Sequence, residues 1–227
     1  HPRRSGLKVF TVVPVACSMS QLPQLNPLLQ RFVAQVEQTL LPDLLLESIT
    51  PHDPVVVRQL PPDWQLLGTG NYAAVLAHPD YPAWVVKIYA PGRPGLPAEQ
   101  EVYRRLGSHP GFSECFYAAE TFLVLKRLRG ITLYDCLHRG VKIPPRVIQE
   151  VDAALAHARS QGLHPHDVHG RNVMICEGCG VVADVSDFLE VETCTAWDDL
   201  KRAYRWVYRP MLSWLPLRVP YFVLDGV

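Results

Sequence analysis

The first 60 positions contain one stretch in which apolar residues recur at helical spacing. Asn26-Pro27 precedes it, and a capping side chain followed by proline in the first turn is typical of a helix start. Pro42 ends the pattern, so we predict a helix over 27–41. Its apolar positions are Leu28, Leu29, Phe32, Val33, Val36, Leu40 and Leu41.

The residues after this helix are rich in proline. A second short apolar run at 44–49 and an extended segment at 55–57 lie in what we interpret as a linker. We therefore assign 1–60 to an N-terminal extension. We expect its helix to pack on the domain that follows; the alternative is a mobile arm that docks on a partner or a membrane. The prolines of the linker are Pro51, Pro54, Pro61 and Pro62.

From position 61 onward the hydrophobic pattern changes. Short β-rich runs come first, with one helical stretch between them, and longer helical stretches follow. Strands first and helices later indicate an α+β fold with two lobes, about 61–128 and 129–227. We predict strands over 64–67, 73–77, 84–90, 122–128, 173–176 and 181–184, and helices over 98–106, 133–138, 145–161 and 197–208.

The composition narrows the class of protein. The 227 residues carry a formal net charge of zero and 48% are hydrophobic, which argues against a disordered chain and against a nucleic-acid binder with a basic surface. No apolar run approaches the ~20 residues of a transmembrane helix. Six cysteines are too few for a disulfide scaffold. Their even number would permit three bridges in an oxidising compartment, but we favour reduced thiols and expect a cytoplasmic protein.

The start of the sequence leaves an alternative open. Arg3, Arg4 and Lys8 precede an apolar stretch that ends at Cys17. This pattern faintly resembles a signal peptide with a lipid-attachment cysteine. Pro14 interrupts the stretch, which favours a short strand or an extended arm.

A glycine-rich turn lies between the first two predicted strands of the domain. It contains Gly68 and Gly70, and Ala73 and Val75 complete the pattern G-x-G-x-x-A-x-V. Glycine lets the backbone approach phosphate oxygens closely. A tight hairpin needs the same residues, so this signal alone leaves a purely structural role open.

Lys87 lies inside the apolar run 84–90. Burying an ammonium group without a partner is costly, so an inward-facing Lys87 requires an anion; a lysine on an edge strand that faces solvent is the alternative. On the next helix, Glu99 shares a face with apolar residues and is the candidate anion. Glu101 lies on another face and fits a solvated surface charge.

The strongest chemical signal follows the helix predicted at 145–161. Asp167 and Asn172 stand five positions apart, directly before an apolar strand. An aspartate can accept or orient a hydroxyl proton, and an asparagine carbonyl can bind Mg²⁺. Asp184 ends the next apolar strand, as a second metal carboxylate should; Asp187 is the alternative in a shifted register.

In order and spacing these features resemble the protein-kinase superfamily. The resemblance covers about 64–210 and consists of a glycine-rich loop, a strand lysine, a helix glutamate, an H-x-D-x-x-x-x-N loop and a D-F-G aspartate. It is greatest to small, divergent bacterial serine/threonine kinase-like proteins. It implies a bilobal fold with a β-rich N-lobe and a reduced helical C-lobe.

The resemblance also implies roles for individual residues. Lys87 would bind the α- and β-phosphates of ATP and pair with Glu99, and Asp167 would be the catalytic base. Asn172 and Asp184 would bind Mg²⁺. The adenine pocket and hinge would include Leu125 and Leu128. The glycine-rich cover of the nucleotide would consist of Gly68, Gly70 and Val75.

Several residues of the family pattern are absent. Pro165-His166-Asp167 replaces H-R-D, Asp184-Val185-Ser186 replaces D-F-G, and no A-P-E segment follows. We therefore expect a shortened activation loop that needs no phosphorylation. We also expect Asp198 or Asp199 to start the central helix of the C-lobe and to brace the catalytic loop.

These observations favour a serine/threonine protein kinase that uses ATP and Mg²⁺. His169 stands where protein kinases carry lysine and small-molecule kinases of this fold often carry histidine, so a small-molecule alcohol is the alternative substrate. A pseudokinase that acts as a scaffold is a third hypothesis. It gives no reason to retain Lys87, Glu99, Asp167, Asn172 and Asp184.

Two further patterns suggest other functions. Cys176 and Cys179 have the spacing of metal ligands, but a structural zinc site needs four ligands and no second pair exists, which favours a plain turn between strands. The helix predicted at 197–208 mixes basic and aromatic residues, as an RNA-binding or membrane-surface helix does. Because the chain has no net charge, we favour a half-buried core helix.

Overall fold

The computed structural model describes residues 26–50, 52–212 and 219. The leader-like pattern that ends at Cys17 lies outside these residues. The chain divides into two compact units. Within the described residues, unit 1 contains 26–96 and 115–127, and unit 2 contains the rest. The elements form a mixed α+β structure, which is compatible with the predicted kinase-like fold.

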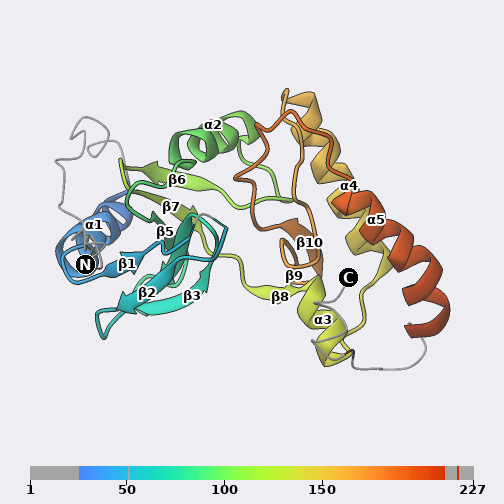
Figure 1. The fold of residues 1–227 in the computed structure, drawn as a ribbon, viewed down its shortest axis with the longest axis horizontal. Helices are drawn as coiled ribbons and strands as arrows, with labels where there is room; N and C mark the ends of the chain where they lie inside the picture. The colour runs from blue at the N-terminus through green and yellow to red at the C-terminus, as the bar shows by residue number, and fades with distance from the viewer. Residues whose placement is uncertain (1–25, 51, 213–218, 220–227) are drawn as a thin grey trace, which may run out of the picture. The chain divides into compact units, whose positions relative to one another are not determined.

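Five antiparallel strands form the main sheet of unit 1 (Figure 1). In spatial order they are β3 (Gln65–Thr69), β4 (Ala73–Ala77), β5 (Trp84–Tyr89), β7 (Phe122–Lys126) and β6 (Cys115–Ala118). β5 lies at the centre and is buried along most of its length, because β4 and β7 pair with its two edges. The sequence predicted every strand of this sheet except β6.

Helix α1 (Pro27–Gln35) begins where the sequence predicted it and continues as a π-helical turn, Val36–Leu40. Asn26 Oδ1 accepts the backbone N–H of Leu28 at 2.8 Å, which is the bond of an N-cap. Leu28 itself is 51% exposed. The buried face of the helix is therefore narrower than the sequence pattern predicted.

The buried face of α1 packs into the core of unit 1. Phe32 is fully buried, and its ring centroid lies 5.0 Å from that of Tyr81 and 5.7 Å from that of Trp84. Trp64 donates its Nε1–H to Thr39 Oγ1 at 3.1 Å and so ties the π-helical turn to the start of the sheet. The helix is part of the folded unit, as we expected, and is not a detached docking arm.

A small antiparallel sheet joins the rest of the extension to unit 1. β1 (Leu45–Glu47) pairs with β2 (Val56–Gln59), and Val55 donates its backbone N–H to the carbonyl oxygen of Gly70 at 2.9 Å. The sequence marked 44–49 as apolar but did not identify a strand there. Three residues are too few to display the period-2 alternation that identifies a strand.

Unit 2 is mainly helical (Figure 1). Its helices are α2 (Leu96–Leu106), α3 (Leu133–Arg139), α4 (Pro145–Ser160) and α5 (Ala196–Ala203). The first residue of α2, Leu96, still belongs to unit 1. α5 continues as a π-helical segment, Tyr204–Leu212. Its antiparallel strands, in the order β10-β9-β8, are β8 (Gly130–Thr132), β9 (Val173–Cys176) and β10 (Cys179–Val182). β10 approaches α4 closely at Gly180, where a Cβ atom would lie 2.5 Å from the backbone oxygen of Val147.

The last helical segment is mostly exposed, whereas we predicted a half-buried core helix. Tyr208 is buried, and its hydroxyl oxygen accepts the backbone N–H of Ile143 at 2.8 Å, whereas Trp206 is 75% exposed. None of the helices in the described chain combines the length and the apolar composition that a membrane crossing requires.

Candidate active site

Buried apolar residues hold the loop that follows α4. The backbone N–H of His164 also bonds to the carbonyl oxygen of Phe188 at 2.8 Å. Between these anchors His164 and Asp167 lie at the surface, and the Asp167 side chain is 51% exposed. A molecule that carries a hydroxyl group can therefore reach this carboxylate. The apolar anchors are Leu163, Val168 and Val173.

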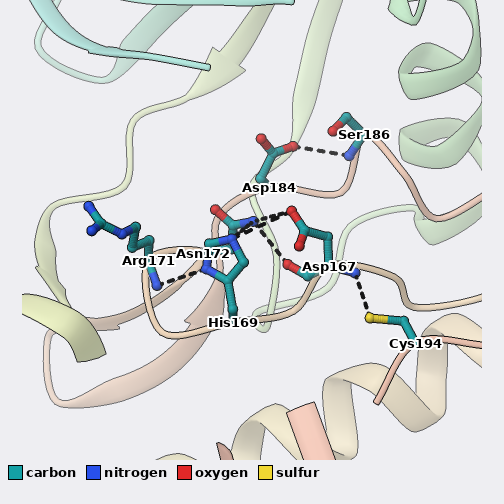
Figure 2. A network of polar contacts seen from close by, with 7 residues as sticks. All are labelled: Asp167, His169, Arg171, Asn172, Asp184, Ser186 and Cys194. Carbon is teal, nitrogen blue, oxygen red and sulfur yellow. Dashed lines mark hydrogen bonds and ion pairs between the residues drawn. The ribbon is translucent and has the colours of Figure 1, made fainter. Parts of the chain in front are cut away.

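Asp167 and Asn172 lie together in this loop (Figure 2). Asn172 Nδ2 donates to the backbone oxygen of Asp167 at 3.0 Å and lies 3.4 Å from Asp167 Oδ2. His169 Nε2 lies 3.5 Å from the same carboxylate oxygen. Because His169 Nδ1 accepts the backbone N–H of Arg171 at 3.2 Å, the proton of a neutral His169 ring is on Nε2. Two nitrogens thus face one oxygen of the Asp167 carboxylate and orient it.

A tight hairpin connects β9 and β10. Its turn residues, Glu177 and Gly178, both have positive φ, 51° and 81°, as the type I′ two-residue turn of a hairpin requires. Cys176 and Cys179 oppose each other on either side of this turn. Within the described residues neither thiol is in a disulfide bond. The turn that the sequence favoured for these two cysteines is therefore confirmed.

The open end of the hairpin brings Asp184 to Asn172. Ala183 donates its backbone N–H to the carbonyl oxygen of Asn172 at 2.8 Å, and the Asp184 side chain follows close to those of Asn172 and Asp167 (Figure 2). Asp184 Oδ1 also accepts the backbone N–H of Ser186 at 3.0 Å. We predicted that the strand would run to Asp184, and this was wrong: β10 ends before it.

The Asp187 carboxyl group lies in the same acidic region. Burial raises its pKa above the ordinary value, and the negative charges of Asp184, Asp167 and Glu190 raise the pKa further, whereas His166 lowers it. Each carboxylate in such a cluster makes ionisation of the next less favourable. A cation bound in this region would relieve the repulsion.

The oxygen donors of this region fit Mg²⁺. This ion is commonly held by one or two carboxylates, waters and substrate phosphate oxygens. Asp184 offers a carboxylate, and Asn172 offers its Oδ1, because its Nδ2 is directed to Asp167. In the part of the chain that the structure describes, no three His, Cys, Asp or Glu side chains are grouped as metal ligands. A metal ion here would therefore need water or phosphate oxygens to complete its shell.

Lys87 lies in the middle of β5, in unit 1. It is only 9% exposed, and its Nζ lies 5.8 Å from the centroid of the Tyr89 ring. Because β5 is the central strand of the sheet, the alternative of an edge lysine that faces solvent is wrong.

The glycine-rich turn connects β3 to β4. Gly70 donates its backbone N–H to the carbonyl oxygen of Ala73 at 2.9 Å and so closes the hairpin. Neither Gly68 nor Gly70 has a positive φ, and a Cβ atom at Gly68 would meet nothing within 4 Å. A left-handed backbone therefore does not account for either glycine, although the pairing of β3 with β4 shifts register between Leu66 and Gly68.

The two glutamates of α2 have the environments that the helical spacing predicted. Glu99 is fully buried. Glu101 lies at the helix surface and bonds Arg104 and Arg105, at 2.6 and 2.7 Å, and these hydrogen bonds lower the pKa of Glu101 to about 2. Glu99 belongs to unit 2 and Lys87 to unit 1, so their pairing stays a prediction.

The other predicted nucleotide contacts are apolar side chains. Val75 is half buried in β4, Leu125 is buried in β7, and Leu128 is half buried in the segment that follows β7. Val75 and Leu125 belong to unit 1 and Leu128 to unit 2, so their contact with one nucleotide stays a prediction.

The expectation that Asp198 or Asp199 braces the catalytic loop was wrong. Asp198 pairs with Lys201 at 3.1 Å. Asp199 accepts the hydroxyl proton of Thr195 at 2.7 Å and pairs with Arg202 at 3.1 Å. Both carboxylates thus bond to residues of α5 itself or to Thr195 just before it.

A cysteine contacts the loop of Asp167 instead. Asp167 donates its backbone N–H to Cys194 Sγ at 3.3 Å (Figure 2). The sequence analysis missed this contact, because Cys194 is 27 positions from Asp167 and no spacing pattern connects the two.

No family model matches the chain. Over 183 residues the chain is 32% identical to a protein of Bacillus subtilis (strain 168) named "Putative serine/threonine-protein kinase YrzF". The match covers 74% of this chain and 79% of that protein. The chain therefore belongs to the kinase-like family of this Bacillus protein.

Proposed function

We propose that the protein is a Mg²⁺-dependent phosphotransferase that moves the γ-phosphoryl group of ATP to a serine or threonine hydroxyl of a protein. One observation carries the proposal: Asp167, Asn172 and Asp184 come together where the catalytic loop meets the open end of the hairpin (Figure 2). The name of the Bacillus relative supports the same reaction class.

Residues of unit 1, together with Glu99 and Leu128 of unit 2, would bind the nucleotide. Lys87 would contact the α- and β-phosphates, with Glu99 as its partner. The open space above the Gly68 backbone supports a close approach of phosphate oxygens to the turn, since a glycine backbone carries no Cβ to obstruct them. Val75, Leu125 and Leu128 would contact the adenine ring.

The residues of unit 2 would act on the acceptor. Asp167 would orient the hydroxyl and take its proton as the oxygen attacks phosphorus, with its carboxylate held by Asn172 and His169. Asn172 and Asp184 would hold Mg²⁺, which neutralises charge on the transferred phosphoryl group. Most of the rate enhancement would come from positioning and electrostatic stabilisation.

A small-molecule alcohol is a second candidate for the acceptor. His169 faces Asp167 Oδ2 at the position where protein kinases carry lysine. The segment between Asp184 and the start of α5 at Ala196 is also short, and it offers little surface on which a protein substrate could dock.

Transfer of radiolabelled phosphate from ATP to generic serine- and threonine-rich proteins tests the proposal. We expect Mg²⁺-dependent labelling by the wild type and a loss of about 10²-fold or more in Asp167→Asn, as expected when a positioned base is removed. Labelling of small alcohols alone would assign the second candidate. A wild-type protein that binds no Mg·ATP in a calorimetric titration and labels nothing would contradict the proposal and favour a scaffold.

A further inference from the structure

Asp167 has a backbone conformation that is uncommon for a residue with a side chain. Its φ is 54°, in the left-handed region where the Cβ atom crowds the backbone. Such a conformation persists only where the surrounding contacts hold it. The direction of the Asp167 carboxylate therefore depends on what fixes its backbone.

Three hydrogen bonds fix the two peptide groups of Asp167. Its carbonyl oxygen accepts Asn172 Nδ2 and the backbone N–H of His169, each at 3.0 Å. Its own N–H donates to Cys194 Sγ at 3.3 Å (Figure 2). The first two bonds come from within the catalytic loop, whereas the third comes from a distant segment.

Cys194 is held in place by residues on either side of the start of α5. Trp197 is buried and donates its Nε1–H to Asp152 Oδ1 at 2.7 Å, which anchors α5 to α4. The Thr195 hydroxyl bonds Asp199 at 2.7 Å. The sulfur atom is therefore presented to the catalytic loop by a segment with its own anchors.

A sulfur acceptor suits the charge of this region. Asp167 and Asp184 both lie close enough to Asp187 for their charges to act on it. A further carboxylate would repel them, whereas a thiol accepts an N–H without adding a negative charge. The two aspartates at the start of α5 bond to other residues.

We propose that Cys194 is a positioning residue for phosphoryl transfer, which holds the left-handed backbone of Asp167 and thereby directs its carboxylate to the acceptor hydroxyl. This inference rests on the function proposed above. The sulfur touches no reacting atom and acts only through Asp167. It therefore affects the rate of transfer and not the binding of Mg·ATP.

Three variants of the full chain test this role by kinetics. Cys194→Ala removes the acceptor, Cys194→Ser keeps an oxygen acceptor, and Cys179→Ala is the control at the exposed hairpin turn. We expect Cys194→Ala to lower kcat about ten-fold with an unchanged KM for ATP, as for a misplaced catalytic group. We expect Cys194→Ser and the control to stay within about three-fold of wild type. An unchanged kcat in Cys194→Ala, or an equal loss in Cys194→Ser, would overturn the role.

Amide hydrogen exchange at Asp167, measured by NMR, tests the same contact without any need for activity. We expect exchange about ten-fold faster in Cys194→Ala than in wild type, and a wild-type rate in Cys194→Ser, because the amide loses or keeps its acceptor. Equal exchange in wild type and Cys194→Ala would overturn the positioning role alone. A wild type that transfers no phosphate would overturn the proposed function and with it the role, whatever the exchange rates.

Discussion

The backbone N–H of Ala183 bonds to the carbonyl oxygen of Asn172 at 2.8 Å. This bond continues the β9–β10 pairing by one residue beyond Val182 and Val173. Asp184 is the next residue along the chain, and Figure 2 shows its side chain close to that of Asn172. Asp187, the alternative metal aspartate, follows three positions later and gains nothing from this pairing.

We predict that Asp184 and Asp187 differ in their importance for Mg²⁺-dependent transfer. Asp184→Asn should lower activity about 10²-fold or more and raise the Mg²⁺ concentration needed for half-maximal rate, because a metal carboxylate is lost. The matched variant Asp187→Asn should stay within about five-fold of wild type. Magnesium titrations of both variants measure this difference. A larger loss of activity in Asp187→Asn than in Asp184→Asn would assign the metal to Asp187.

The packing of α1 predicts that one alanine substitution in this helix lowers the stability of the protein strongly and that another has little effect on it. Phe32→Ala should lower the free energy of unfolding by about 3–5 kcal/mol, since it empties a fully buried aromatic site. Leu28→Ala, on the exposed side of the same helix, should change it by about 0.5 kcal/mol or less. Urea unfolding of both variants measures the difference. Similar values for the two would argue against the packing of this helix.

Stability should depend on pH through a histidine pair in unit 2. His109 and His157 stack with ring centroids 4.3 Å apart, and burial together with the nearby His157 lowers the pKa of His109 below 6.5. Its unfolded form then binds a proton more readily than its folded form. The stability that a neutral His109 contributes is present above about pH 6.5 and is lost as the pH falls through the folded value.

Urea unfolding at pH 7.5, 6.5 and 5.5 tests this dependence. His109→Asn removes the titration while it keeps an acceptor for the backbone N–H of Gly111, which bonds His109 Nδ1 at 3.1 Å in the wild type. We expect the free energy of unfolding to fall less steeply with acidification in this variant. The same slope in both proteins would mean that His109 does not titrate on unfolding in this range.

The cysteines should differ widely in reactivity. Cys136 is buried, and burial together with the charge of Asp135 raises the pKa of its thiol to about 11. Cys179 is exposed. Since the thiolate is the reactive form, iodoacetamide at pH 7.5 should label Cys179 in the folded protein and Cys136 only after unfolding. Mass spectrometry of labelled peptides reads both sites, and early labelling of Cys136 would contradict its burial.

Elements that carry their own periodic signal could be predicted from the sequence. β4 and β9 have the predicted bounds, and α4 ends one residue before its predicted end. Strands β1, β6 and β8 were missed, because three or four residues show no clear alternation and their pairing depends on distant partners. Such strands are defined by the strand beside them more than by their own residues.

In the candidate site, too, contacts within one segment could be predicted and contacts between distant segments could not. Asp167 and Asn172 come together within one loop, so their spacing was sufficient to predict it. The bracing role assigned to Asp198 or Asp199 was wrong because each carboxylate finds a cation three positions along its own helix, Lys201 or Arg202. Local helical pairing therefore outweighed the long-range contact that the family pattern suggested.

The two-residue turn between β9 and β10 limits how this segment can change in length. In a strand, each added or deleted residue turns the following side chains to the opposite face. A single insertion in one strand would therefore carry Asp184 away from Asn172, whereas one insertion in each strand would lengthen the hairpin and leave its open end unaltered. In relatives that keep this turn, the interval between the two residues should vary by even numbers.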